Sequence, residues 1–123
     1  MLKSLIVAAV LAGAATVSVA QETKPVVVLV KVFASAGRGD ELQTLYVKRL
    51  NYLRKAEPDA TFRVHRSTKD PDTFLWYEVY PSKAAYEKHV KVVMANFKKE
   101  AGPTPAGIIA RPSESETFTE FGQ

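Results

Sequence analysis

One segment near the start of the chain is apolar on both sides of a strand. Residues 26–34 read VVVLVKVFA, which is rich in β-branched side chains and carries one charge, Lys31. Alternate residues of a strand point to opposite faces, so both faces of this strand are apolar. A strand of an open antiparallel sheet usually keeps one polar face. We therefore expect helices to cover one face and, because the chain is short, a second subunit to cover the other.

The first 20 residues have the pattern of a secretory signal peptide. An early lysine precedes an apolar run over residues 5–17, and the small side chains of Ser18 and Ala20 follow at the spacing that signal peptidase recognises. The run is short for a transmembrane helix, although an uncleaved N-terminal anchor is the alternative. We expect this segment to be removed, residues 21–123 to form one domain, and the mature protein to be secreted or periplasmic without stable membrane insertion.

The composition excludes several kinds of site. Seventeen basic and 13 acidic residues are interspersed along the chain, which is typical of a solvated surface and not of a nucleic-acid interface. There is no cysteine, so no disulfide or cysteine metal site can form. The two histidines, His65 and His89, are not at helical spacing, and no metal site is predicted. Phosphate-loop, Gly-x-Ser-x-Gly and Rossmann motifs are missing.

Two helices and three further strands are predicted after the first strand. Asp40 is placed to cap a helix that runs to about Ala56, with leucine and tyrosine side chains at three- and four-residue spacing. Residues 61–67 and 74–80 have strand patterns and flank a turn-rich segment, which predicts a hairpin. A second helix is expected over residues 83–100, with Ser82 as its N-cap and an apolar stripe of Tyr86, Val90, Val93, Met94 and Phe97.

The C-terminal part is less regular. Residues 101–116 contain three prolines and two glycines, which predicts a long connection with a short extended piece at Ile108 and Ile109. Residues 117–121 predict a last strand. The order is therefore β-α-β-β-α-β, the ferredoxin-like α+β unit, in which both helices lie on one face of an antiparallel sheet. This order also leaves one sheet face to be covered by a second copy, so a homodimer is expected.

The segment from Asp72 to Val90 contains the main candidate site. Glu78 on a strand and His89 on the following helix are joined by a short turn, and a pair between them would satisfy both groups. Histidine titrates near neutral pH, so His89 is a candidate pocket base that Glu78 orients. The alternative is that the pair is structural and holds strand to helix.

A set of aromatic side chains accompanies this pair. They are either core residues or a surface on which a flat ligand stacks, because such side chains serve both purposes. Trp76 shares its strand face with Glu78, so the two point the same way. The set comprises Trp76, Phe33, Tyr46, Tyr86 and Phe97.

The same segment resembles the antibiotic biosynthesis monooxygenase (ABM) domain. The resemblance rests on an aromatic followed by glutamate, Tyr77 and Glu78, and on an alanine and a histidine spaced along the next helix, Ala85 and His89. It implies a dimeric α+β barrel with a pocket between sheet and helices. Some members oxygenate quinols or polycyclic aromatics without metal or flavin. Residues 26–34 contain no asparagine, on which the haem-degrading members rely.

Two functions are consistent with these observations. The first is an exported, cofactor-independent monooxygenase of a small quinol-like or aromatic substrate, in which His89 assists deprotonation, Glu78 orients it and Trp76 helps to exclude water. The second is a non-catalytic small-molecule-binding or stress-related dimer that uses the same pocket.

Overall fold

The computed structural model describes residues 24–122. The predicted signal peptide and its cleavage site therefore lie outside the described residues. The described chain forms four strands and a series of helices in the predicted order. These elements are β1 (Val26–Phe33), α2 (Gly39–Ala56), β2 (Thr61–Arg66), β3 (Thr73–Tyr80), α3 (Lys83–Lys88), η1 (His89–Val93), α4 (Met94–Ala101) and β4 (Glu114–Thr119).

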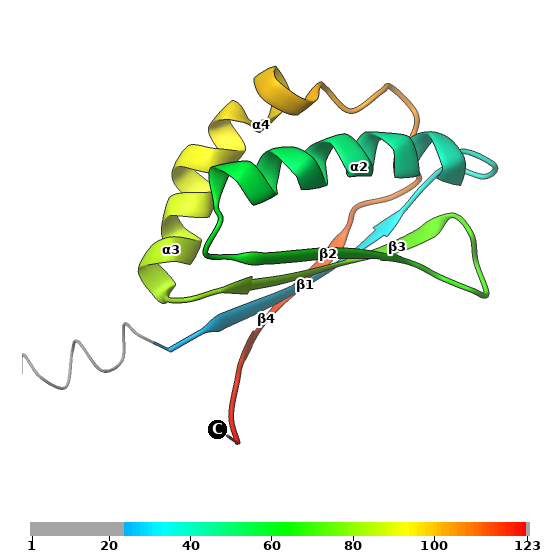
Figure 1. The fold of residues 1–123 in the computed structure, drawn as a ribbon. Helices are drawn as coiled ribbons and strands as arrows, with labels where there is room; N and C mark the ends of the chain where they lie inside the picture. Colours follow the sequence, from blue (N-terminus) through cyan, green and yellow to red (C-terminus); the bar gives the residue numbers. More distant parts are fainter. Residues whose placement is uncertain (1–23, 123) are drawn as a thin grey trace, which may run out of the picture.

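The four strands form one antiparallel sheet in the order β2-β3-β1-β4. All the helices lie over the same face of this sheet (Figure 1). The ferredoxin-like α+β fold is thus confirmed. β1 lies between β3 and β4, and its Val28 and Val32 are buried beneath the helices. The core is therefore the layer between sheet and helices, as expected for two layers that each have one apolar face.

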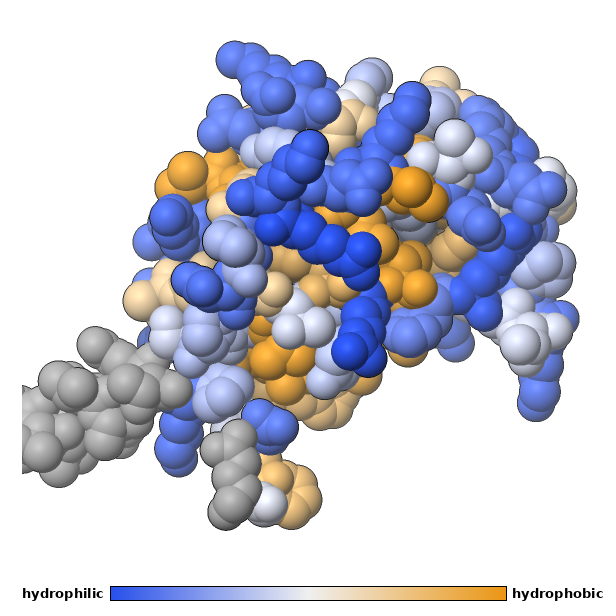
Figure 2. Space-filling model, viewed as in Figure 1, coloured by the Kyte–Doolittle hydropathy of each residue, from blue (hydrophilic) through white to orange (hydrophobic). Residues whose placement is uncertain are grey.

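The surface of the molecule is largely hydrophilic on the side that Figure 2 shows. Hydrophilic side chains cover most of this side, and apolar surface lies between them near its middle. Val47 on α2 is an apolar side chain that is 52% exposed. None of the helices in the described part of the chain is long and apolar enough to cross a membrane.

The start of α2 differs from the prediction. Asp40 does not cap the helix; its carboxylate is exposed and pairs with Arg66 at 2.7 Å. The cap comes instead from Asp72, whose carboxylate oxygens accept hydrogen bonds from the backbone N–H of Gly37 at 3.0 Å and of Gly39 at 2.9 Å. A Cβ atom on Gly39 would collide with this carboxylate, so glycine permits the close approach.

The second helix contains a π turn that the sequence pattern did not predict. Residues 89–93 are π-helical, and the N–H of Met94 bonds to the carbonyl of His89, five residues earlier. Because a π turn is wider than an α-helical turn, side chains spaced by four residues stay on one face of it. In a regular α-helix, a side chain four residues further along the chain is rotated by about 40° around the helix axis. His89, Val93 and Phe97 are consequently buried. The predicted stripe was wrong at Val90 and Met94, which are 51% and 43% exposed.

The C-terminal connection packs more tightly than its composition suggests. Ile108 is fully buried, and Ile109 forms an isolated bridge with Ala34 at the end of β1. The predicted extended piece is therefore present. β4 begins at Glu114, three residues earlier than predicted, and ends at Thr119. Phe121 lies beyond it and is 94% exposed.

The other face of the sheet has an apolar centre. Val27 pairs with Val79 on one side and with Phe118 on the other, and Leu29 pairs with Tyr77. These residues share the strand face opposite the helices. Charged or polar side chains surround them on the same face, namely Arg63, His65, Lys31, Glu114 and Glu116.

Candidate functional site

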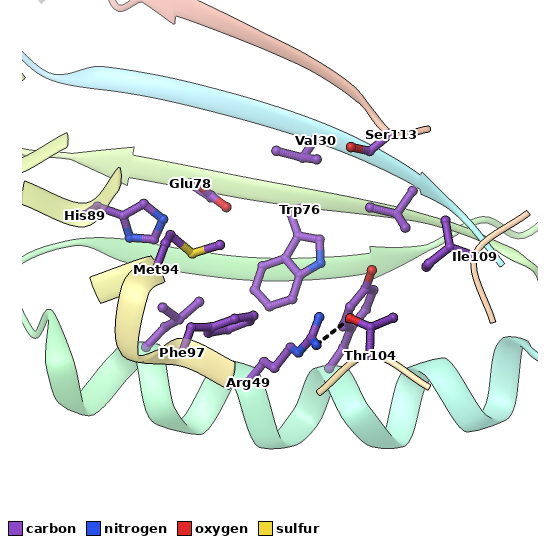
Figure 3. A pocket seen from close by; sticks show the side chains of 13 residues that line it. Val30, Arg49, Trp76, Glu78, His89, Met94, Phe97, Thr104, Ile109 and Ser113 are labelled. Atoms are coloured by element: carbon purple, nitrogen blue, oxygen red, sulfur yellow. Dashed lines mark hydrogen bonds between the residues drawn. The ribbon is translucent and has the colours of Figure 1, made fainter. Parts of the chain in front are cut away.

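A cavity of about 320 Å³ lies between the sheet and the helices. This volume falls within the range of small-molecule sites. Side chains from β1, α2, β3, the π turn, α4 and the C-terminal connection line it (Figure 3). The lining residues are Val30, Val32, Tyr46, Arg49, Leu53, Trp76, Glu78, His89, Met94, Phe97, Thr104, Ile109 and Ser113.

His89 and Glu57 form a buried pair at one end of this cavity. His89 Nδ1 lies 2.6 Å from Glu57 Oε2, and the two side chains are only 7% and 11% exposed. A carboxylate accepts hydrogen bonds, so Nδ1 is the donor to Glu57, and in the neutral imidazole the lone pair lies on Nε2. Nε2 makes no hydrogen bond to a described side chain. Glu57 therefore fixes the orientation of the imidazole ring, and Nε2 is free to accept a hydrogen bond or a proton.

This pairing corrects the prediction that Glu78 would be the partner of His89. Glu57 follows the last residue of α2, where sequence reasoning had seen only the end of a helix. Its position after α2 and before Pro58 carried no local signal for the contact, because His89 is 32 residues away.

Glu78 has a different partner. Its Oε2 accepts a hydrogen bond of 2.7 Å from the hydroxyl of Tyr80, which is fully buried. Burial raises the pKa of Glu78 above its ordinary value of 4.5, although the hydrogen bond from Tyr80 opposes this rise. Burial and the nearby Glu78 carboxylate raise the pKa of Tyr80, so its hydroxyl stays a donor. Glu78 remains a cavity residue, as its strand face predicted.

Three of the five predicted aromatic side chains line the cavity: Trp76, Tyr46 and Phe97. Tyr46 and Trp76 are in edge-to-face contact, with ring centroids 5.0 Å apart. The other two do not line the cavity. Phe33 points to the opposite sheet face and lies under the guanidinium of Arg111, and Tyr86 packs on the ring of Tyr80.

Arg49 is a cavity residue that sequence reasoning missed. It lies on the buried side of α2, at a position between the apolar residues Tyr46 and Leu53. The apolar stripe could have drawn attention to it, because a charged residue on a buried face is unusual. Thr104 also lines the cavity and accepts a hydrogen bond of 2.8 Å from Arg49 Nη2.

The arrangement provides a base, a half-buried acid and a flat apolar wall. His89 Nε2 can accept a proton, Glu78 can hold one, and Trp76 and Phe97 can contact a ring (Figure 3). Within residues 24–122, no three His, Asp or Glu side chains gather closely enough to hold a metal ion. The π turn that orients His89 is a feature that often occurs at functional sites.

Comparison with known proteins gives a consistent result. The family model for antibiotic biosynthesis monooxygenase matches residues 25–94, which is more than half of the chain and includes Glu57, Glu78 and His89. No curated protein matches the chain.

Solved structures that carry the same family name share the fold. A protein from Chloroflexus aurantiacus J-10-fl superposes with a TM-score of 0.59 at 20% identity, over 80% of this chain and 95% of that one. A protein from Caulobacter crescentus CB15 superposes with a TM-score of 0.66 at 14% identity, over 83% and 94%. One from Nitrosomonas europaea gives 0.59 at 17% identity, over 80% and 92%. At these identities the likeness concerns the fold.

Proposed function

Because this chain belongs to the antibiotic biosynthesis monooxygenase family, we propose that it is a cofactor-independent monooxygenase of a small quinol-like or aromatic substrate. The observation that carries the proposal is the buried His89–Glu57 pair, which leaves Nε2 of His89 free at the wall of an apolar cavity. A positioned imidazole whose other nitrogen is held by a carboxylate is a recurrent general base.

The proposed reaction begins with proton transfer to His89. Nε2 takes a proton from an acidic C–H group that a neighbouring ring hydroxyl or carbonyl activates, and Glu57 stabilises the resulting imidazolium. The substrate anion then supplies electrons to O₂ through a radical pair, and the peroxide that forms at that carbon takes the proton back from His89. Loss of water from the peroxide leaves a carbonyl group, so a CH₂ group and O₂ become C=O and H₂O.

Other cavity residues have supporting roles in this scheme. Trp76 and Phe97 contact the ring and exclude water from the anion. Glu78, whose pKa is raised by burial, lies in the cavity where its protonated form can donate a hydrogen bond to a substrate oxygen. The role first assigned to Glu78, orientation of the imidazole, passes to Glu57.

We also propose that the protein acts as an exported homodimer. The apolar leader over residues 5–17, followed by Ser18 and Ala20, supports export. The apolar centre of the open sheet face, with its charged surround, supports pairing with a second copy.

Oxygen uptake with a panel of hydroquinones and polycyclic phenols tests the function. We expect His89→Ala to lower the rate about 100-fold or more, the usual contribution of a general base. Glu57→Gln should lower it less, because a neutral amide still accepts the Nδ1 proton but no longer stabilises the imidazolium. Thermal melting of each variant shows whether the loss of activity exceeds the loss of folded protein.

A matched variant serves as the control. Glu87→Gln neutralises an exposed carboxylate on α3, away from both the cavity and the open sheet face. It should not change the rate of oxygen uptake. Unchanged uptake in His89→Ala would contradict the proposal. Tight ligand binding without any uptake in the wild type would instead support the non-catalytic binding function.

A further inference from the structure

Arg49 is a buried arginine without an acidic partner among the described residues. It is 8% exposed, and no carboxylate of residues 24–122 forms an ion pair with it within 4.0 Å. Burial of a charge without a counter-charge costs free energy. The position therefore requires an explanation beyond packing.

The contacts of Arg49 hold the side chain in place but use only part of its donor capacity. Nη2 donates to Thr104 Oγ1 at 2.8 Å and more weakly to the carbonyl of Gly102 at 3.4 Å. The guanidinium lies over the ring of Phe97, 4.5 Å from its centroid. Nε is buried without a partner, and Nη1 makes no hydrogen bond to a described residue.

A purely structural role would explain only the guanidinium nitrogen that bonds to Thr104. The bond to Thr104 ties α2 to the connection that follows α4, and a single neutral donor would suffice for that tie. Such a role leaves the charge without a counter-charge and leaves donor groups without acceptors, and both cost free energy. In Figure 3, one guanidinium nitrogen points to Thr104 and another points toward Trp76 and the interior of the cavity. A terminal guanidinium nitrogen that is not bonded to Thr104 thus faces the space in which a ligand would lie.

We propose that Arg49 binds a carboxylate of the ligand, so that the substrate is an aromatic or quinol-like acid. The inference rests on the proposed function, because it assumes that this cavity holds the small molecule. Arginine suits the task, since its planar guanidinium matches a carboxylate and stays charged when buried. The apolar wall of the cavity would strengthen this ion pair by excluding water.

The charges along the cavity also give the ligand a direction. Glu78 and His89 lie at one end, Arg49 and Thr104 lie at the other, and Trp76 lies between them (Figure 3). A carboxylate would be attracted by Arg49 at the second end, away from the acidic side chains of Glu57 and Glu78 at the first. The ring would then lie along Trp76, with its reactive carbon toward His89.

Binding of a matched pair of ligands tests this inference. The probes are 1,4-dihydroxy-2-naphthoate and its neutral analogue 1,4-dihydroxy-2-naphthamide, titrated by calorimetry under nitrogen so that neither is oxidised. Both probes carry the same ring hydroxyl groups. A difference in affinity between them therefore reports recognition of the carboxylate and not of an ionised hydroxyl. We expect the acid to bind wild-type protein at least about tenfold more tightly, a difference of about 1.4 kcal/mol. Trp76 is the one tryptophan of the chain, so its fluorescence reports binding in this cavity independently.

Two variants assign the preference to Arg49. Arg49→Met keeps an extended side chain over Phe97 without the charge, and it should remove the preference for the acid while binding of the amide persists. Arg49→Lys keeps the charge but not the planar fork, and it should retain a smaller preference. Lys48→Met is the control, because it removes one charge from an exposed position of the same helix and should change neither affinity.

The outcomes separate this inference from the proposed function. Equal binding of acid and amide to wild-type protein would overturn the role of Arg49 and leave the cavity as a binding site. Failure of both probes to bind would overturn both. A preference that persists in Arg49→Met would show that another group recognises the acid. If Arg49→Met does not fold, the wild-type comparison and Arg49→Lys decide the question.

Discussion

Glu78 is a half-buried carboxylate whose ionisation the fold disfavours. Its pKa lies above the ordinary value of 4.5 because burial penalises the charged form. The native state therefore binds its proton more tightly than the unfolded chain does. This contribution to stability is fully present below about pH 4.5 and is lost as the pH rises through the raised native pKa.

Glu78→Gln should remove that pH dependence. The amide oxygen can still accept the hydrogen bond from Tyr80, while no charge is created in the cavity at neutral pH. We expect the variant and the wild type to be similarly stable near pH 4, and the variant to become the more stable of the two as the pH approaches 7. Urea unfolding at a series of pH values measures the difference, with Glu87→Gln as the exposed control. A variant that instead loses stability relative to wild type as the pH rises would show that Glu78 is stabilised as the anion.

Among the elements, α2 depends on a contact from a distant loop. The carboxylate of Asp72, which precedes β3, accepts hydrogen bonds from the backbone at the start of the helix. These N–H groups have no partner within the helix, and a negative charge there also suits the helix dipole. One side chain thus fixes the hairpin to the helix that carries Arg49.

Asp72→Ala should lower the free energy of unfolding by about 1 kcal/mol, the typical cost of losing an N-cap. Denaturant unfolding followed by circular dichroism measures this change. Asp40→Ala is the matched control, because its carboxylate is 95% exposed and pairs only with Arg66 at the surface. Equal losses in the two variants would contradict the assignment of the cap to Asp72.

The whole molecule presents one sheet face that no described element covers. Val27, Leu29, Tyr77, Val79 and Phe118 form its apolar centre. An exposed apolar area with a polar surround is typical of an interface. Because this face is built from the same strands as the cavity, a partner there would support the sheet from behind.

Light scattering after gel filtration should therefore give about twice the subunit mass at micromolar concentration. Leu29→Glu places a charge in the centre of the face and should shift the protein to monomer, since an unpaired buried charge is costly. Val47→Glu is the control, because Val47 is exposed on α2, on the helical side of the sheet. A wild-type monomer, or a Leu29→Glu variant that stays dimeric, would argue against pairing through this face.

Local patterns in the sequence were sufficient for the order of the elements and for the strand faces, but not for the π turn or for the cap of α2. Alternation placed Trp76 and Glu78 on one side of β3, and Ser82 caps α3 as its position predicted, since its side chain accepts a hydrogen bond from the N–H of Ala85 at 3.1 Å. Such signals are local, because backbone geometry repeats every two or 3.6 residues and a cap acts within one turn. The order of the elements and the layers followed from these patterns, and the family resemblance, now confirmed, added the pocket between sheet and helices.

The partners of the polar groups were decided only by the tertiary structure. A periodic pattern shows which side of an element a residue occupies, but it does not show which distant residue it meets there. Glu57 reaches His89 because the end of α2 and the π turn pack together, and Asp72 reaches α2 because the hairpin folds back on it. Arg49 turns into the cavity because two residues from distant parts of the chain contact its side chain. Phe97 lies within the second helix, and Thr104 lies beyond its end.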